Sequence, residues 1–167
     1  MVSDNWGNTS GTGRSKDGQY HGDVSAIKIT GGQKAARYMY WGPTGTNRDV
    51  RIEGMPKKRT PRNTGVFTSG AATGGLGGYK VKIVGAKKLS YGNGIYGRNM
   101  SVAVKSSGTC ANHGDSGGPV YTISHSTGFA IARGVISGGN VVSGVGCVLS
   151  FTDIRDAWAA MPGTLLR

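Results

Sequence analysis

The residues whose types and spacing suit chemistry stand together in the run Gly114-Asp115-Ser116-Gly117-Gly118-Pro119. Glycine permits positive φ angles and close backbone approach, so a serine in this run can lie on a sharp turn with its hydroxyl exposed. Acyl transfer needs that arrangement, because a nucleophilic oxygen must lie beside N–H donors that stabilise the developing oxyanion. The run therefore predicts a nucleophilic Ser116, and the alternative is a plain turn.

A serine hydroxyl becomes a good nucleophile only when a base takes its proton. In the triad arrangement the base is a histidine that a buried carboxylate orients. The chain has three histidines, His21, His113 and His125, and a candidate carboxylate, Asp23. The base must be within hydrogen-bond reach of both the serine and the carboxylate, and no histidine has a spacing that suggests this. Each is therefore interpreted as an ordinary surface or wall histidine.

Short strand patterns recur along the chain and would have to position these groups. In Tyr79–Val84, apolar and basic residues alternate, which is typical of a half-buried strand. Many short strands joined by turns, in a chain with 31 glycines, predict an antiparallel barrel. The expected strands are 23–29, 37–41, 49–52, 66–68, 79–84, 100–104, 120–123, 130–136 and 147–151.

Both ends of the chain differ from this pattern. Residues 1–20 are polar and predict a loop or a poorly ordered leader. Residues 153–161 have helical spacing, with Asp153 as the N-cap and Pro162-Gly163 as the stop. Residues 53–64 are basic and broken by prolines; we interpret them as a solvated linker in preference to a polyanion-binding patch.

Composition limits the possible partners. The net charge of +12 predicts non-specific affinity for polyanions. No stacking-aromatic pattern or nucleic-acid motif accompanies the charge, so we expect no specific nucleic-acid partner. No apolar run is long enough to span a membrane, and the N-terminus lacks a signal-peptide pattern.

From about residue 63 onward, the chain resembles the second barrel of the chymotrypsin-like serine proteases, and is most similar to the bacterial streptogrisin and α-lytic protease branch. The resemblance rests on the run Cys110–Pro119, on Ser137-Gly138-Gly139 followed by Cys147, and on the C-terminal helix. It implies an all-β, chymotrypsin-like double barrel. Residues 63–167 would form a complete second barrel with the nucleophile loop and the helix, and residues 1–62 a leader and a remnant of the first barrel.

The resemblance also implies roles for single residues. Ser116 would be the nucleophile, and the amides of Gly114 and Ser116 would form the oxyanion hole. Asp23, in a shorter match over Gly22–Lys28, would orient the histidine. Asp115 would hold the loop through a buried charge contact. No cofactor and no metal ion are implied.

Other implied roles concern substrate binding. Ser137, Gly138 and Gly139 would lie beside an extended peptide substrate as an added strand, and His113 would line the specificity pocket. A disulfide would tie the two pocket walls together through Cys110 and Cys147; two buried free thiols are the alternative. A disulfide implies an oxidising compartment, so we expect a secreted protein.

The sequence departs from the family at the histidine. The family carries it before the aspartate, in a Thr-Ala-x-His-Cys-like segment that this chain lacks. We prefer the interpretation that the chain is an N-terminally truncated serine endopeptidase, which a missing N-terminal segment or a pro-region would complete. Residues 1–60 would then be poorly packed or covered by a partner. The alternatives are a catalytically inactive peptide-binding module and a basic binder of nucleic acid or polysaccharide.

Overall fold

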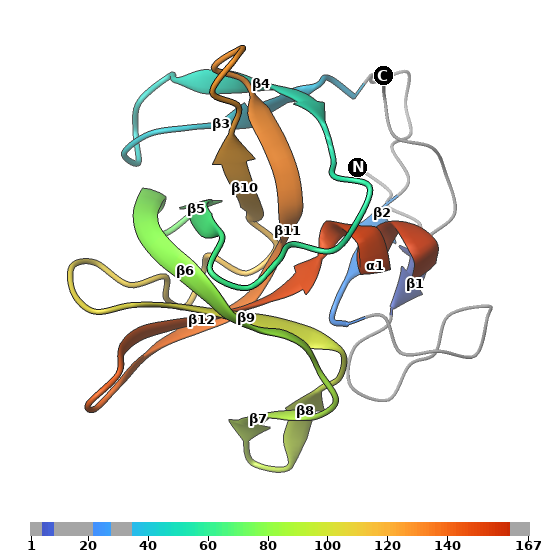
Figure 1. The fold of residues 1–167 in the computed structure, drawn as a ribbon, viewed down its shortest axis with the longest axis vertical. Coiled ribbons are helices and arrows are strands. Elements are labelled where there is room, and N and C mark those ends of the chain that lie inside the picture. The colour runs from blue at the N-terminus through green and yellow to red at the C-terminus, as the bar shows by residue number, and fades with distance from the viewer. Residues whose placement is uncertain (1–4, 9–21, 28–34, 161–167) are drawn as a thin grey trace.

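Six antiparallel strands close into a barrel in the C-terminal part of the chain (Figure 1). The computed structural model describes residues 5–8, 22–27 and 35–160. Around the barrel the strand order is β10-β5-β6-β9-β12-β11, and pairing of β10 with β11 closes the ring. The strands are β5 (Gly65–Gly70), β6 (Gly74–Ala86), β9 (Met100–Lys105), β10 (Pro119–Ile123), β11 (Ala130–Val142) and β12 (Gly146–Asp153).

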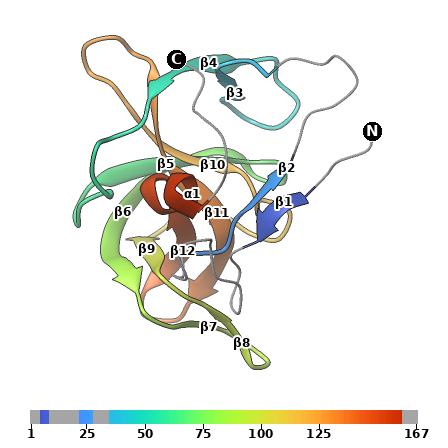
Figure 2. The same cartoon turned by 90° about the vertical axis from the view of Figure 1, so that its right-hand side faces the viewer.

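The remaining elements attach to this barrel. The hairpin of β3 (Tyr38–Tyr40) and β4 (Asp49–Gly54) joins the sheet by parallel pairing of β4 with β11. A second hairpin, β7 (Leu89–Gly92) with β8 (Ile95–Gly97), lies at the opposite end of the molecule in both views (Figures 1 and 2). Strands β1 (Asn5–Asn8) and β2 (Ser25–Ile27) form a separate antiparallel pair, and the chain continues after β12 into α1 (Ile154–Ala160).

The barrel interior contains the main hydrophobic core. Along β6, Tyr79 and Val81 are buried while Lys80 and Lys82 are exposed, so the predicted alternation is confirmed over these four residues. It is wrong at Ile83, which is exposed, because the pairing with β9 shifts register between Val81 and Ile83. Strands alternate in this way because successive side chains point to opposite faces of a sheet. The core cluster comprises Val66, Tyr79, Val81, Ala103, Ala111, Val120, Ile136, Cys147, Leu149 and Phe151.

The predicted helix cap is confirmed. The amide of Arg155 donates a 2.9 Å hydrogen bond to Asp153 Oδ1, which is the contact that an N-cap carboxylate makes with the second helical residue. Within residues 5–8, 22–27 and 35–160, no helix is long and apolar enough to cross a membrane.

The prediction of a solvated linker over residues 53–64 is wrong in part, since residues 53 and 54 end β4 and residues 59 and 60 are held by contacts with the C-terminal elements. Thr60 is fully buried, and its amide donates a 2.8 Å hydrogen bond to Asp153 Oδ2. Arg59 donates from both Nε and Nη2 to Asp156 Oδ1, at 2.9 and 2.6 Å. These contacts lie more than 90 residues apart in sequence, so local composition gave no sign that this segment packs against α1.

Two strand assignments also differ from expectation. β1 lies within residues 1–20, which were expected to be a loop, because pairing with β2 orders a polar segment. The β7–β8 hairpin was not predicted. Its turn is Asn93-Gly94, with φ angles of 50° and 75°, the pair that favours a tight type I′ hairpin.

Candidate active site

The predicted nucleophile lies exposed on the loop between β9 and β10. Gly114 and Gly117 on either side have φ angles of 93° and 85°, a conformation that favours glycine. The loop is fastened to β11, because Gly117 N donates to Ile136 O and Ile136 N donates to Gly118 O, both at 2.8 Å. Ser116 therefore lies on a sharp, fixed turn with its hydroxyl accessible.

The two amides expected to form an oxyanion hole are those of Gly114 and Ser116. Within the described residues, neither amide donates a hydrogen bond, and both residues are exposed. An exposed backbone N–H without a protein partner can receive an anionic ligand. Their joint action on an oxyanion stays a prediction.

Asp115 fixes the loop through hydrogen bonds to its carboxylate. Its buried carboxylate, 1% exposed, accepts four hydrogen bonds from neutral donors: the amides of Ala72, Thr73 and Asn112 at 2.9 Å, and the Thr73 hydroxyl at 2.7 Å. In the described chain no cation pairs with it. The expected charge contact stays a prediction; the donors that the described residues supply are dipolar and come from the turn between β5 and β6 and from Asn112 in the loop itself.

These contacts control the ionisation of Asp115. Burial acts to raise the pKa of the carboxyl, but the hydrogen bonds from Asn112, Thr73 and Ala72 outweigh burial and hold the pKa below its ordinary value of 3.8. The fit is close: a Cβ built on Gly70 would collide with the Asp115 carboxylate, so only glycine is accommodated there.

Asp23 lies against the barrel, held by its main chain. Its amide donates to Thr152 Oγ1 at 2.8 Å, and the same hydroxyl donates to the Asp23 carbonyl at 3.0 Å. Burial raises the pKa of the half-buried Asp23 carboxyl, and a hydrogen bond with the Ser137 side chain lowers it in part. The fully buried Thr152 thus anchors Asp23 to β12.

Ser137 connects the two predicted catalytic residues. Its hydroxyl donates to the Asp23 carbonyl, and its own carbonyl accepts from Ser116 Oγ, both at 3.4 Å. The structure therefore brings Ser116, Ser137 and Asp23 together from three distant parts of the sequence. Their catalytic roles stay predictions.

No histidine completes the group within the described residues. His113 is exposed on the nucleophile loop, and its amide donates to Asn112 Oδ1; His125 is exposed in the turn between β10 and β11. No hydrogen bond joins either imidazole to Ser116 or Asp23 in this part of the chain. His21 lies outside the described residues. The expected place of His113 in a specificity pocket stays a prediction.

Tyr91, on β7, belongs to the same site and was missed by the sequence analysis. Burial raises the pKa of its phenol, the side chains of Ser150 and Ser137 lower it in part, and the charge of Asp23 raises it. Its ring covers Gly138, where a built Cβ would lie 3.5 Å from Tyr91 Cε1. The Asn-Gly turn that follows Tyr91 was the signal that could have located this hairpin.

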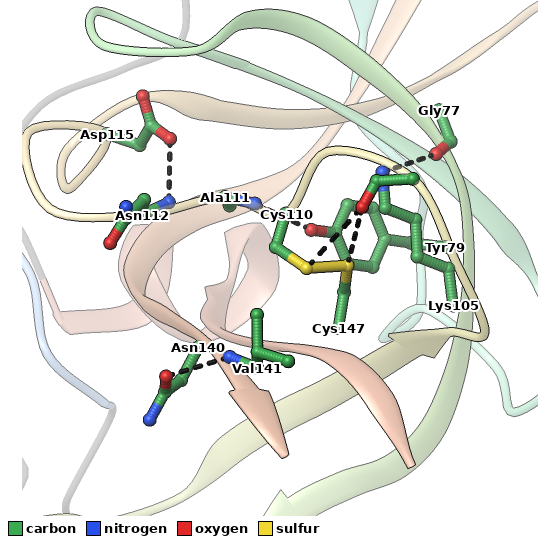
Figure 3. The surroundings of a disulfide bond; sticks show 11 residues. Gly77, Tyr79, Lys105, Cys110, Ala111, Asn112, Asp115, Asn140, Val141 and Cys147 are labelled. Carbon is green, nitrogen blue, oxygen red and sulfur yellow. Dashed lines mark hydrogen bonds between the residues drawn. A yellow bond between two sulfur atoms is a disulfide. The ribbon is translucent and has the colours of Figure 1, made fainter. Parts of the chain in front are cut away.

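The predicted disulfide between Cys110 and Cys147 is confirmed (Figure 3). It ties the start of the nucleophile loop to β12, where Cys147 pairs with Lys105 of β9 and with Val141 of β11. The next residue, Ala111, donates its amide to the hydroxyl of buried Tyr79 at 2.8 Å. A covalent bond and a buried hydrogen bond thus fix this end of the loop.

One edge of β11 stays open beside Ser116. β10 pairs with β11 only up to Val135, and the loop contacts of Gly117 and Gly118 reach Ile136. From Ser137 onward, β12 covers one edge of β11, and no described strand pairs with the other. An extended peptide can add to such an edge through main-chain hydrogen bonds.

No protein-family model matches the chain, and no curated protein matches it. Among solved structures it is similar to a glutamic acid specific serine protease that utilizes a histidine triad in substrate binding, with 21% identity and a TM-score of 0.63 over 84% of this chain and 65% of that one. Cellulomonas bogoriensis chymotrypsin is 21% identical, with a TM-score of 0.60 over 86% of this chain and 71% of that one. Thermobifida fusca Protease A is 21% identical, with a TM-score of 0.62 over 83% of this chain and 65% of that one.

The fold is that of the chymotrypsin-like serine proteases. The predicted fold class, an all-β protein with one closed barrel, further strands and a C-terminal helix, is therefore confirmed. The chain spans about 65% of the length of the glutamic acid specific protease and of Protease A. In the described residues, no three side chains that commonly ligate metals gather in one place.

Proposed function

We propose that this chymotrypsin-like chain acts as a serine endopeptidase with Ser116 as its nucleophile. The observation that carries the proposal is the contact chain Ser116–Ser137–Asp23. It supports the assignment because an exposed hydroxyl, two amides without a described partner and a half-buried carboxylate lie at one place. These are the parts that acyl transfer needs, apart from a base.

In the proposed reaction, Ser116 Oγ attacks the carbonyl carbon of the scissile peptide bond, and its proton passes to a base. The amides of Gly114 and Ser116 stabilise the negative oxygen of the tetrahedral intermediate. The intermediate collapses, the C–N bond breaks, and the amine leaves with the proton. Water then hydrolyses the acyl-enzyme. Asp23 orients the base, which is a histidine in the arrangement that this fold suggests.

The proposed substrate is an extended peptide that adds to the open edge of β11 beside Ser137, Gly138 and Gly139. The confirmed disulfide favours an oxidising compartment, so we propose that the protein is secreted. A pro-region or a further segment that carries the histidine is a proposed partner. No cofactor enters the mechanism.

Labelling with a fluorophosphonate probe, with and without added imidazole, tests the proposal. Imidazole replaces a missing base, so we expect slow labelling of Ser116 that imidazole accelerates at least tenfold, and no labelling of Ser116→Ala. Rapid stoichiometric labelling without imidazole means that the chain holds its own base, which alanine variants of the three histidines would locate. A folded protein that is not labelled even with imidazole contradicts the assignment of Ser116.

A second candidate function is peptide binding without hydrolysis. It is favoured by the finding that neither described imidazole contacts Ser116 or Asp23. Loss of one triad member leaves roughly 10³–10⁴-fold catalysis over water, from the oxyanion hole and binding alone. Binding of an extended peptide that is not cleaved, with or without imidazole, would favour this function over the first.

A further inference from the structure

The nucleophile loop and β11 touch beside the open edge at which the proposed peptide substrate would pair. A Cβ built on Gly139 would overlap the Ala111 carbonyl oxygen and lie 2.6 Å from the carbonyl carbon and 2.9 Å from the Ala111 Cβ. Real Cβ atoms essentially never approach other heavy atoms below 3.0 Å. The two backbones are therefore in direct contact, with no width between them for a side chain.

The contact between Ala111 and Gly139 forms a closed slot, and both of its walls are held in place. The disulfide fixes Cys110 to Cys147 on β12, and Figure 3 shows Ala111 following directly, with its amide bound to Tyr79. Ala111, Tyr79 and Cys147 are each at most 1% exposed. On the other wall, Gly139 pairs with Leu149 of β12. Closely packed interiors resist the insertion of extra atoms, so widening the slot would require these contacts to break.

The neighbouring position on β11 is covered too. The ring of Tyr91 and the hydroxyl of Ser150 lie over Gly138, and Ser150 Oγ donates to the Gly138 carbonyl at 3.2 Å. The faces of this short segment are therefore occupied, while its edge is open to main-chain pairing. Such a surface can pair with the main chain of a peptide and leaves little room for its side chain.

We propose that Ala111 and Gly139 determine specificity, and that the residue supplying the scissile carbonyl is glycine or alanine. This inference rests on the proposed function, because it places the peptide along β11 with its carbonyl at Ser116. A larger side chain at that position would have to separate Ala111 from Gly139. Both walls are uncharged at the contact, so they also offer no ion pair to a glutamate or lysine side chain.

Peptide boronic acids test the inference without requiring turnover. In these probes boron replaces the scissile carbonyl carbon, and a bond forms between boron and Ser116 Oγ while the hydroxyl proton passes to solvent. Four tripeptide probes, with the side chain of alanine, valine, phenylalanine or glutamate at boron, would be titrated calorimetrically. We expect the alanine probe to bind at least tenfold more tightly than the phenylalanine and glutamate probes.

The possible outcomes separate the two proposals. Equal or tighter binding of the phenylalanine or glutamate probe overturns the small-residue specificity while leaving Ser116 as the nucleophile. If every probe binds wild type and Ser116→Ala equally, the proposed function fails, and the specificity inference fails with it.

A matched pair of variants tests whether the Ala111 wall sets the preference for a small side chain. Tyr79→Phe removes the hydrogen bond to Ala111, whereas Tyr121→Phe removes a buried hydroxyl that has no partner within the described residues. We expect the preference for alanine over phenylalanine to fall at least threefold in Tyr79→Phe and to be unchanged in Tyr121→Phe. Ala111→Gly, which removes the Cβ facing Gly139, should act in the same direction. An unchanged preference in both folded wall variants would refute this role of the Ala111 wall.

Discussion

The barrel and the hairpin β3–β4 are built from similar strands, but they bury very different amounts of their surfaces. Barrel strands pair on both edges and enclose a core cluster of ten residues. The hairpin adds a cluster of only four, Met39 and Val50 with Tyr121 and Ala130 of the barrel. β3 forms the outer edge of the sheet, and its Tyr38 is 56% exposed. Closure of the ring thus decides where this chain buries most of its core.

The proposed catalytic residues likewise come from two regions, the barrel and the N-terminal part of the chain. Ser116 and Ser137 belong to the barrel, whereas Asp23 precedes β2, in the N-terminal part of the chain. Asp23 reaches the site because Thr152, on a barrel strand, holds its main chain. The precision of the site therefore comes from the barrel, whose Thr152 and Ser137 hold the N-terminal segment at Asp23. The variants below test that view, beginning with the largest expected effect.

Replacing both cysteines, as Cys110→Ser with Cys147→Ser, should weaken the barrel most. The disulfide closes a loop of 37 residues, for which the chain-entropy model gives about 4 kcal/mol of stability. Urea unfolding, followed by tryptophan fluorescence, would measure the change. Wild type in reducing buffer is the control and should lose a similar amount; no loss in either case would contradict the view that the barrel depends on this bond.

Asp115→Asn should cost roughly 3 kcal/mol, because four donors would face a weaker acceptor in a buried site. The pKa of Asp115 is depressed in the folded protein, so its contribution is present above the unfolded value of 3.8 and is lost as pH falls through the folded pKa. The raised pKa of Asp23 acts in the opposite direction. Unfolding midpoints between about pH 2 and 7 should show a shallower acid decline in Asp115→Asn than in wild type. Equal slopes would contradict the assignment.

Thr152→Val should release Asp23 at a cost of about 1–2 kcal/mol, since a fully buried hydroxyl both accepts from and donates to its main chain. Thr152→Ser keeps that hydroxyl and is the control. Hydrogen exchange at the Asp23 amide should accelerate in the valine variant, while amides of β9 and β12 keep their protection. Uniform acceleration throughout the barrel would show that the two regions are not separable at this residue.

Tyr79→Phe and Tyr121→Phe form the smallest contrast. The first change removes a hydrogen bond from the Ala111 amide and should cost about 1 kcal/mol. The second removes a hydroxyl whose burial raises its pKa to about 12 and which has no partner among the described residues, so stability should stay the same or rise slightly. Thermal unfolding would measure both. A larger loss in Tyr121→Phe than in Tyr79→Phe would reverse this ranking.

Local sequence patterns predicted much of the barrel. The alternation over Tyr79–Lys82 and the capping of the helix by Asp153 depend on neighbours in sequence, and both are found as expected. The Ser116 turn was predictable for the same reason, because its glycines flank it directly. The pairing of Cys110 with Cys147 was suggested by the count of two cysteines and supported by the family resemblance.

Other parts of the site depend on contacts between distant residues. Nothing near Asp115 in sequence indicates that its partners are Ala72 and Thr73, more than 40 residues earlier. The packing of Thr60 against Asp153 also joins residues that are far apart in sequence. Tyr91 is a different case, because the Asn-Gly turn marked its hairpin, yet only the folded chain shows that this hairpin reaches Gly138. The closure between Ala111 and Gly139 likewise appears only in three dimensions.

Thr152 forms hydrogen bonds with the amide and the carbonyl of Asp23 and not with its carboxylate. The attachment is consequently indifferent to which side chain occupies that position. Protein engineers could exchange Asp23 for asparagine, glutamate or histidine and expect the backbone to return to the same place. Position 23 therefore offers a route for installing new acid–base chemistry next to Ser137 without redesigning the scaffold.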